Sequence, residues 1–238
     1  MPAVPETPGG PPIAPSTPDG PAARPLKTLG RVLAVLLALG ILTDAASVFA
    51  GYEQVRVLER LAAGEDVPPD EIAASDERYG WSGTLQMATY LLAVILWLVW
   101  FHRAYANSPK LAATDRRFGT GWAVGAWFVP ILNLFRPKQI ANDIWRASDP
   151  DPPAGVPFGD WPVSMLVHVW WAAWLVFSLV SNFATRFLFR AETVEDQRTA
   201  VSATMGADQI SILAGLLAVA VVVAMTRRYE RRRAQLAA

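Results

Sequence analysis

The chain of 238 residues contains no cysteine and only two histidines. The absence of cysteine excludes disulfides, thiol catalysis and thiolate metal sites. His102 and His168 are far apart in the sequence and lack the spacing of a ligand pair, so a zinc site is not expected. Nor do we find a nucleophile–base pair or a phosphate-binding loop. We therefore expect a protein that is not an enzyme and that binds no cofactor.

Charge is also scarce. Only 18% of the residues are charged, against about a quarter in typical soluble domains. The formal net charge of +0 argues against a nucleic-acid partner. Hydrophobic residues make up 53% of the chain and gather in four long segments, at about 29–51, 82–103, 163–187 and 207–227. Each segment approaches or exceeds the ~20 residues that cross a hydrocarbon core of ~30 Å.

Backbone groups in lipid must pair within their own segment, so each apolar segment should be a helix. A soluble helical core would instead need polar stripes along its helices. Residues 91–101 and 210–225 offer almost none. The sequence therefore predicts an all-α integral membrane protein with about four transmembrane helices, in a membrane domain that spans residues 27–230.

Both ends of the chain are expected to lie outside this domain. Residues 1–26 are rich in proline, glycine, serine and threonine. Such a tract cannot bury enough apolar surface to order itself, which predicts a disordered, polyproline II-like tail, with a PxxP-type ligand for a partner as the alternative. Residues 231–238 should form a short basic tail. The arginines between Arg227 and Arg233 are expected to anchor the last helix, with binding of anionic lipid head groups as the alternative.

Basic residues in the short loops predict the orientation in the membrane. They precede the first segment and follow the second and the fourth, which places both termini in the cytoplasm. The loop from Tyr52 to Trp81 is rich in acidic residues and the loop from Leu188 to Gly206 is mildly acidic, so both should face outside. Each loop is expected to begin as a helical extension of the segment before it, over 52–63 and 188–203.

The stretch 118–148 lies between the second and third segments and has a pattern of its own. A glycine-rich apolar run from Gly121 to Phe135 is interrupted by Pro130 and Asn133. At roughly 15 residues the run is too short for a full crossing, and both of its flanks are expected in the cytoplasm. We therefore predict a broken, re-entrant or interfacial element. A short interfacial helix should follow from Pro137, with Ile140, Ala141, Ile144 and Trp145 on its apolar face.

Tryptophans are concentrated around this element. Most of the ten map to the inner half of the predicted bundle, although aromatic belts normally occupy both membrane interfaces. This excess favours a bulky aromatic layer packed around the central stretch. Two interpretations remain open for the layer: ordinary interfacial anchoring, and a pocket for a lipid or apolar ligand. Asn133 likewise either satisfies backbone groups that Pro130 frees or presents a polar group in an apolar pocket.

One acidic residue, Asp44, lies well inside an apolar segment. An intramembrane carboxylate is costly and marks a functional candidate. We predict that Asp44 pairs with Gln86, Asn182 or Arg186, which lie at similar depth. A polar clamp between helices and a relay for protons or cations are the two interpretations.

The motifs FHRAYANS and GWAVGAWFVPILNLFRPKQIANDIWRASDP resemble the signature of an actinobacterial membrane-protein family known only as domain-of-unknown-function family 4328. The resemblance covers roughly Leu29 to Arg228. It implies a multi-pass protein of the plasma membrane and no established activity. The residues that carry it are Phe101, His102, Arg103 and Ala104, then Trp127, Phe128, Pro130 and Asn133, then Pro137, Gln139, Trp145, Ala147 and Ser148.

We expect a non-enzymatic scaffold or regulatory protein that presents its central motif at the cytoplasmic face. Its partners would be membrane lipids, a protein at that face or a second copy of the chain. The alternative is a small oligomeric transporter or channel-like protein that uses Asp44. The motif residues proposed to contact a ligand or partner are Trp127, Phe128, Pro130, Asn133, Pro137, Gln139, Trp145 and Arg146.

Overall fold

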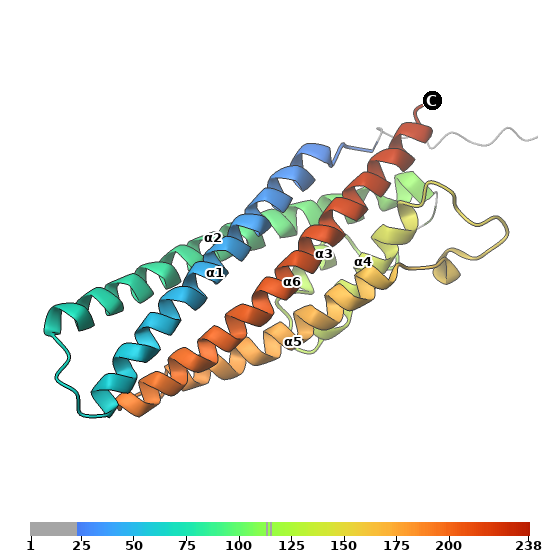
Figure 1. Ribbon diagram of the computed structural model, residues 1–238. Helices are drawn as coiled ribbons and strands as arrows, with labels where there is room; N and C mark the ends of the chain where they lie inside the picture. Colours follow the sequence, from blue (N-terminus) through green and yellow to red (C-terminus); the bar gives the residue numbers. More distant parts are fainter. Residues whose placement is uncertain (1–22, 113, 115) are drawn as a thin grey trace, which may run out of the picture.

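The computed structural model describes residues 23–112, 114 and 116–238. Within these residues all regular secondary structure is helical, which confirms the predicted all-α class (Figure 1). Most of the predicted tail, residues 1–22, lies outside the described residues. The elements in chain order are α1 Lys27–Ala62, α2 Pro69–Ala112, α3 Trp122–Gly125, η1 Leu132–Leu134, α4 Arg136–Ala147, η2 Phe158–Asp160, α5 Met165–Leu188 and α6 Val194–Gln235.

The four long helices α1, α2, α5 and α6 carry more apolar surface than the bundle buries. Each contains an 18-residue window with a mean hydropathy between 1.5 and 2.3, and only 17% to 33% of each window is buried inside the protein. The apolar residues of a water-soluble bundle would turn inward, whereas most of these face outward. All four helices are therefore long and apolar enough to cross a membrane, as predicted.

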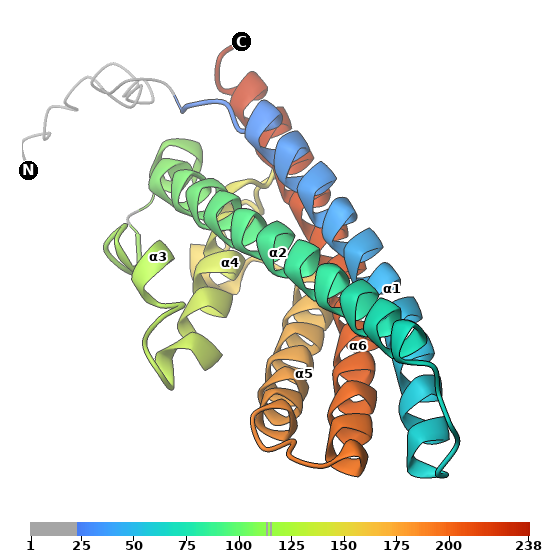
Figure 2. The same ribbon diagram turned by 90° about the vertical axis from the view of Figure 1, so that its left-hand side faces the viewer.

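The long helices form an open row in the order α2, α1, α6, α5. α1 packs along both α2 and α6, and α5 packs along the other side of α6. Among the described residues, α2 and α5 share no comparable backbone contact, so the row does not close on itself. Instead, α3 and α4 pack against α2, and α4 also contacts α5 and α6 (Figure 2). The central stretch thus fills the space between the two edge helices.

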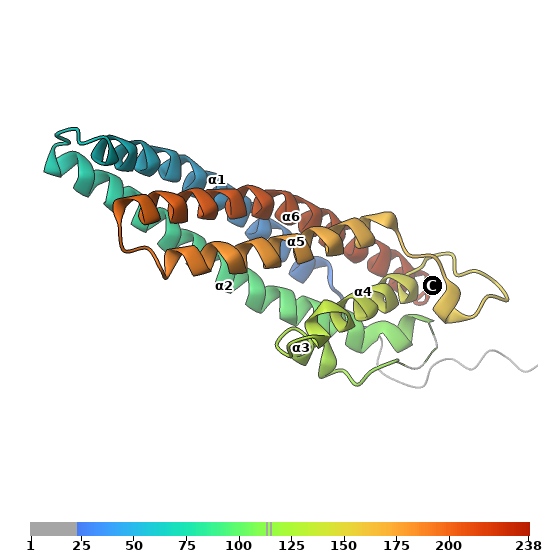
Figure 3. The ribbon, with the colours of Figure 1, turned by 90° about the horizontal axis from the view of Figure 1, so that it is seen from below.

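The two ends of the bundle differ. α4 lies at the same end as the last turns of α2 and α6, whereas the α1–α2 and α5–α6 connections lie at the other end (Figure 3). We call these the basic end and the acidic end, after the charges that the sequence places there. They correspond to the predicted cytoplasmic and outer sides.

Glycines on both helices permit the close approach of α1 and α6. A Cβ built on Gly30 would lie 2.8 Å from Cγ2 of Thr226, and one built on Gly215 would lie 2.9 Å from Cγ1 of Ile41. Neither position leaves room for a methyl group, so glycine permits the contact. The chain covers the same number of residues from Gly30 to Ile41 as from Gly215 to Thr226. The two antiparallel helices therefore keep one register over this stretch.

The start of α1 is tied to the end of α6. The backbone N–H groups of Leu26 and Lys27 donate to Oε1 of Glu230, at 2.6 and 2.9 Å. The first N–H groups of a helix have no partner inside it, and a carboxylate is favourable at that position. Leu26 is also fully buried, and the carbonyl of Arg24 accepts a hydrogen bond from the Tyr229 hydroxyl at 2.7 Å. Ala23 and Leu26 are thus buried against the bundle, although the sequence predicted disorder up to residue 26.

Three of the four long helices extend beyond their predicted bounds. α1 continues to Ala62, which confirms the predicted extension over 52–63, and α2 begins at Pro69 within the predicted outer loop. The two extensions are paired by polar side chains: Gln54 donates to Asp76 at 2.7 Å and accepts from Ser75 at 2.7 Å. Six of the eight acidic residues between Tyr52 and Trp81 therefore lie on helices, and Glu65 and Asp66 lie in the short connection between them.

The predicted extension of α5 over 188–203 was wrong. α5 ends at Leu188, and α6 already begins at Val194. Thr193 and Asp196 form a capping box, in which the Thr193 hydroxyl accepts from the Asp196 N–H at 3.1 Å and the Asp196 carboxylate accepts from the Thr193 N–H at 3.1 Å. This reciprocal pair starts a new helix at that point. α6 then runs to Gln235, so most of the predicted basic tail is helical too.

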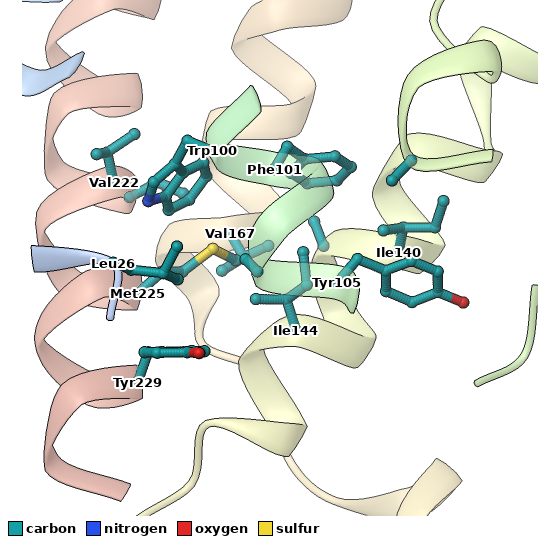
Figure 4. Packing of buried hydrophobic residues seen from close by; sticks show 14 of the residues in the cluster. Leu26, Trp100, Phe101, Tyr105, Ile140, Ile144, Val167, Val222, Met225 and Tyr229 are labelled. Carbon is teal, nitrogen blue, oxygen red and sulfur yellow. The ribbon is translucent and has the colours of Figure 1, made fainter. Parts of the chain in front are cut away.

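The best-packed core lies at the basic end, where residues 23–26 and the helices α1 to α6 all contribute buried side chains. Figure 4 shows part of it. α4 contributes two isoleucines to it, although α4 is polar on its other face. Because these side chains come from segments far apart in the chain, their burial fixes α4 against the long helices. The largest fully buried side chains here are Leu26, Leu33, Trp100, Phe101, Tyr105, Leu111, Ile140, Ile144, Val167, Val221, Met225 and Tyr229.

We expect Gly30→Ala to destabilise the bundle and Gly40→Ala, its matched control on the same helix, not to. Alanine ordinarily stabilises a helix interior by up to about 1 kcal/mol relative to glycine, and at Gly40 the nearest outside atom lies 3.9 Å from an added Cβ. At Gly30 the methyl group overlaps Thr226, and overpacking of this kind costs about 1–3 kcal/mol. Thermal unfolding in detergent measures the difference. Equal melting temperatures for the two variants would contradict the close contact of α1 with α6.

Candidate functional site

The central stretch descends along α2, turns and returns to the basic end through α4. Its start is held by Tyr105, whose hydroxyl accepts from the Phe118 N–H at 2.9 Å. Its deepest ring, Trp127, packs near Trp97, two helical turns further from the basic end. Its end lies at Trp145, whose ring is covered by the Arg228 guanidinium. The stretch therefore enters and leaves at the same end of the bundle, as predicted for a re-entrant or interfacial element.

Trp127 is the anchor of this element. Its ring lies 6.0 Å from Trp97 and 5.7 Å from Phe101 on α2, and 6.1 Å from Trp171 and 5.4 Å from Trp174 on α5. Edge-to-face ring pairs at such distances contribute about 0.5–1.5 kcal/mol each beyond area burial. The structure thus brings together the aromatic layer that the sequence predicts, and Trp127 joins the two edge helices through it.

The turn after Trp127 is strained and apolar. Ile131, which follows Pro130, has φ 68°, an unusual conformation for a β-branched residue. Phe128 and Ile131 are 66% and 71% exposed and point away from the bundle. The Asn133 N–H donates to the carbonyl of Val129 at 3.0 Å, and the Asn133 side chain is half-buried in η1. This contact is made by the backbone, so both interpretations of the Asn133 side chain stay predictions.

α4 begins with a favourable first turn. Pro137 occupies the first turn of the helix, where a missing N–H has no cost. The Arg136 guanidinium lies 4.1 Å from the Trp122 ring and 4.7 Å from the Phe118 ring. These cation–π contacts attach the start of α4 to the descending arm of the element. Gln139 is half-buried beside them on the helix.

The most unusual group of the element is Asp143. Asp143 is only 3% exposed, and among the described residues neither of its carboxylate oxygens has a hydrogen-bond donor. Arg117 and Arg146 approach Oδ1 to 3.4 and 3.7 Å, close enough for attraction but outside hydrogen-bond geometry. Burial raises the pKa of Asp143, and the two guanidinium groups oppose that shift. A buried carboxylate without donors is costly, so Asp143 requires an explanation.

A cavity of about 120 Å³ lies next to this carboxylate. Arg116 and Arg117 flank it on the exposed side, and Tyr105 and Ser108 line it on the side of α2. The cavity is well below the 300–1,000 Å³ of pockets for drug-sized ligands. It has room for one side chain or a few waters, and Asp143 is one of the residues that line it.

Arg146 and Trp145, both predicted motif residues, have separate partners. Arg146 donates from Nε to the carbonyl of Trp161 at 2.8 Å, which fixes the segment that leads to α5. Trp145 lies under Arg228, with 4.7 Å between the guanidinium carbon and the ring centre. Trp145 thus faces α6, whereas Asp143 faces α2. The motif residues form two neighbouring sites and not one.

Lys138 also lies on α4, and its amine donates to the Asn142 side chain. Burial lowers the pKa of Lys138 to about 8, and the nearby positive charge of Arg146 acts in the same direction. A lysine with this pKa is partly neutral near physiological pH. The lysine lies between Pro137 and Gln139, two predicted motif residues, but the sequence pattern alone did not single it out.

The intramembrane polar residues meet in a second cluster, nearer the acidic end. The Gln86 amide on α2 donates to Asp44 on α1 at 2.7 Å and to Asp208 on α6 at 2.8 Å, and Ser47 donates to Asp208 at 2.8 Å. The predicted pairing of Asp44 with Gln86 is thus observed. Among the described residues, neither carboxylate has a Lys or Arg within 4.0 Å.

The other two predicted partners of Asp44 lie elsewhere. Asn182 donates to the carbonyl of Ser178 on its own helix at 2.7 Å, and Arg186 lies over the Phe183 ring. Asp208 was missed because it stands at the predicted edge of the fourth segment, where a carboxylate is unremarkable. The antiparallel helices α1 and α6 keep the register in which Gly30 lies against Thr226, and this register brings Asp208 beside Ser47. The sequence alone did not reveal that register.

The fold and this site define a class: a four-helix bundle of membrane-spanning length with an aromatic-anchored hairpin inserted between its edge helices. The chain belongs to the family described as Domain of unknown function (DUF4328), whose profile matches residues 63–227. The match confirms the family that the sequence motifs resemble, and it includes the whole central stretch. It does not reach α1, so it begins later than the expected Leu29. No curated protein and no solved structure matches the chain.

We expect Lys138 to react with acylating reagents at a lower pH than a free lysine side chain does. At pH 8 about half of the Lys138 amine is neutral, whereas well under about 1% of an ordinary lysine is. Pulse labelling with limiting acetic anhydride between pH 6 and 11, followed by peptide mass spectrometry, gives the midpoint of reactivity for Lys138, with a short lysine peptide in the same solution as the reference. The expected midpoint for Lys138 is about 8, and one no lower than that of the reference peptide would contradict the burial of its amine.

Proposed function

We propose that the protein is a non-enzymatic membrane scaffold or regulatory protein whose partner protein docks at the basic end beside Asp143. A single observation carries this proposal: the Asp143 carboxylate is buried yet has no hydrogen-bond donor in the part of the chain that the structure describes. The carboxylates of Asp44 and Asp208 are also buried, and both accept hydrogen bonds. Of these three buried carboxylates, Asp143 in the central stretch is therefore the one that lacks a hydrogen-bond donor among the described residues.

The surroundings of Asp143 are suited to a side chain that arrives from outside. The adjacent cavity of about 120 Å³ admits one amide, hydroxyl or ammonium group of a partner, which would donate to the carboxylate. Arg117 is 44% exposed at the side chain and can pair with an acidic residue on the same partner. The packed core beneath α4 holds these groups in place before a partner binds, which lowers the entropic cost of docking.

The location of the site supports a role at the cytoplasmic face. The basic end is the side that the positive-inside rule assigns to the cytoplasm. A soluble or membrane-bound partner that meets the bundle there encounters a rigid surface made of α4 and the loop before it. Residues 136–147 and their neighbours all lie within the matched family range.

We test this by site-specific photo-crosslinking in cells. A photoreactive residue is placed at Arg116, on the rim of the cavity, and a second at Trp81, exposed at the acidic end, as the control position. We expect a discrete adduct from position 116 and not from position 81. Asp143→Ala should weaken the adduct about 10- to 100-fold, because a hydrogen bond to a charged group contributes about 1.5–3 kcal/mol.

Two further variants separate docking from general effects of charge. Asp143→Asn keeps one acceptor oxygen and should retain part of the adduct. Asp151→Asn removes an exposed carboxylate at the same end and should leave the adduct unchanged. An adduct of equal yield in the wild type and in Asp143→Ala would refute docking at this site.

A second candidate function is transport, favoured by the cluster of Asp44, Gln86 and Asp208. Two carboxylates that share one amide donor, with no basic residue within 4.0 Å among the described residues, suit a proton or monovalent cation. In proteoliposomes with an entrapped pH-sensitive dye, proton flux should fall at least tenfold in Asp44→Asn and in Asp208→Asn. The exposed Asp66→Asn is the control. Flux no higher than in protein-free liposomes would rule this function out.

A further inference from the structure

A groove of about 210 Å³ lies between the end of α4 and the last turns of α6. Trp145 and Pro150 form one wall of the groove, and Ala224, Arg227, Arg228 and Arg231 form the other. None of these residues belongs to the cavity beside Asp143. The groove is thus a separate site, with its own lining and its own charge.

The three arginines of the groove differ in whether they have an acidic partner. Arg228 forms an ion pair with Asp149, lies 4.7 Å from the Trp145 ring and donates from Nε to the carbonyl of Trp145 at 3.4 Å. Arg227 and Arg231 are exposed, and among the described residues neither has an acidic partner within 4.0 Å. They stand one turn apart on the same helix, where like charges repel. The groove therefore carries positive charge that an anion would neutralise.

The position of the groove indicates where that anion comes from. The apolar part of α6 ends at Met225 and Thr226, which are buried, and the arginines follow directly. Tryptophan and arginine at the end of an apolar helix are typical of the level of lipid head groups. With the four helices in a bilayer, the groove would open at the depth of the lipid phosphates.

The size of the groove restricts the ligand further. At about 210 Å³ it lies below the range of pockets for drug-sized molecules. One phosphate group fits this space, and guanidinium groups bind phosphate oxygens through paired N–H donors. Trp145 supplies an apolar wall against which the glycerol part of a lipid can lie.

We propose that this groove binds the phosphate group of an anionic phospholipid, with Arg227 and Arg231 as the phosphate ligands. Arg228 is a positioning residue here: its ion pair with Asp149 and its contact with Trp145 hold the aromatic wall in place. The site is independent of partner docking beside Asp143. Asp143→Ala should leave lipid binding unchanged, so failure of either proposal can be distinguished from failure of the other.

The experiment counts lipids bound to the full chain by native mass spectrometry, during titration with dioleoyl phosphatidylglycerol or dioleoyl phosphatidylcholine. The test variant is Arg227→Gln/Arg231→Gln. The matched control is Lys27→Gln/Arg31→Gln, which removes the same charge, also one turn apart and exposed, from α1 at the same end. Each arginine near an anionic surface contributes about fivefold in affinity. We therefore expect a loss of about 25-fold in the test variant and less than about threefold in the control.

A competition measurement distinguishes a lipid phosphate from free inorganic phosphate as the ligand. Competition by millimolar inorganic phosphate would support a phosphate site that soluble anions also reach, whereas its absence would support the lipid as the ligand. Equal losses in the test and control variants would overturn the proposal, because they would show diffuse surface charge. Equal binding of phosphatidylcholine and phosphatidylglycerol by the wild type would overturn it as well. Melting temperatures of both double variants verify that the fold is retained.

Discussion

The packing of Trp127 between α2 and α5 is the interaction on which the functional end of this molecule depends. The four long helices form an open row, and the two edge helices share little direct backbone contact within the described residues. Trp127 contacts aromatic rings on both of them and fixes the central stretch in the space that is left. α4 can then return against α2 and α6, and both sites at the basic end follow from its position.

The buried carboxylates of the bundle differ in their hydrogen bonding. Near the acidic end, Asp44 and Asp208 share the Gln86 amide, so a costly pair of groups is satisfied within the helix interface. At the basic end, Asp143 has two arginines nearby but no hydrogen bond from any residue that the structure describes. Breaking a satisfied network destabilises a protein, whereas an unsatisfied group can gain a partner without losing an existing one. The unsatisfied carboxylate lies in the central stretch, where the backbone of Ile131 is also strained, and both features are typical of functional sites.

Sequence patterns determined the four helices and the hairpin because these depend on hydropathy and proline, which act locally. The motif residues Trp127 and Trp145 were also identified, but their separate roles were not, since these depend on which long helix each ring faces. Asp208 and the cap from Glu230 were missed for a related reason: each depends on the register of α1 against α6, which only a close contact such as Gly30 with Thr226 reveals. The start of α6 at Val194 was predictable from the local sequence, because Thr193 and Asp196 have the spacing of a capping box. We did not predict it.

The carboxylate of Glu230 also constrains how the protein is made. Translation delivers α1 first, yet the group that satisfies its leading amides is supplied by the last helix, more than two hundred positions later. The nascent first helix must therefore remain in the translocation machinery or the bilayer with its amino end hydrated until synthesis is almost finished. Assembly is then completed by late contacts that join the two extremities of the bundle, and a chain truncated before residue 229 lacks both the Tyr229 and the Glu230 contact.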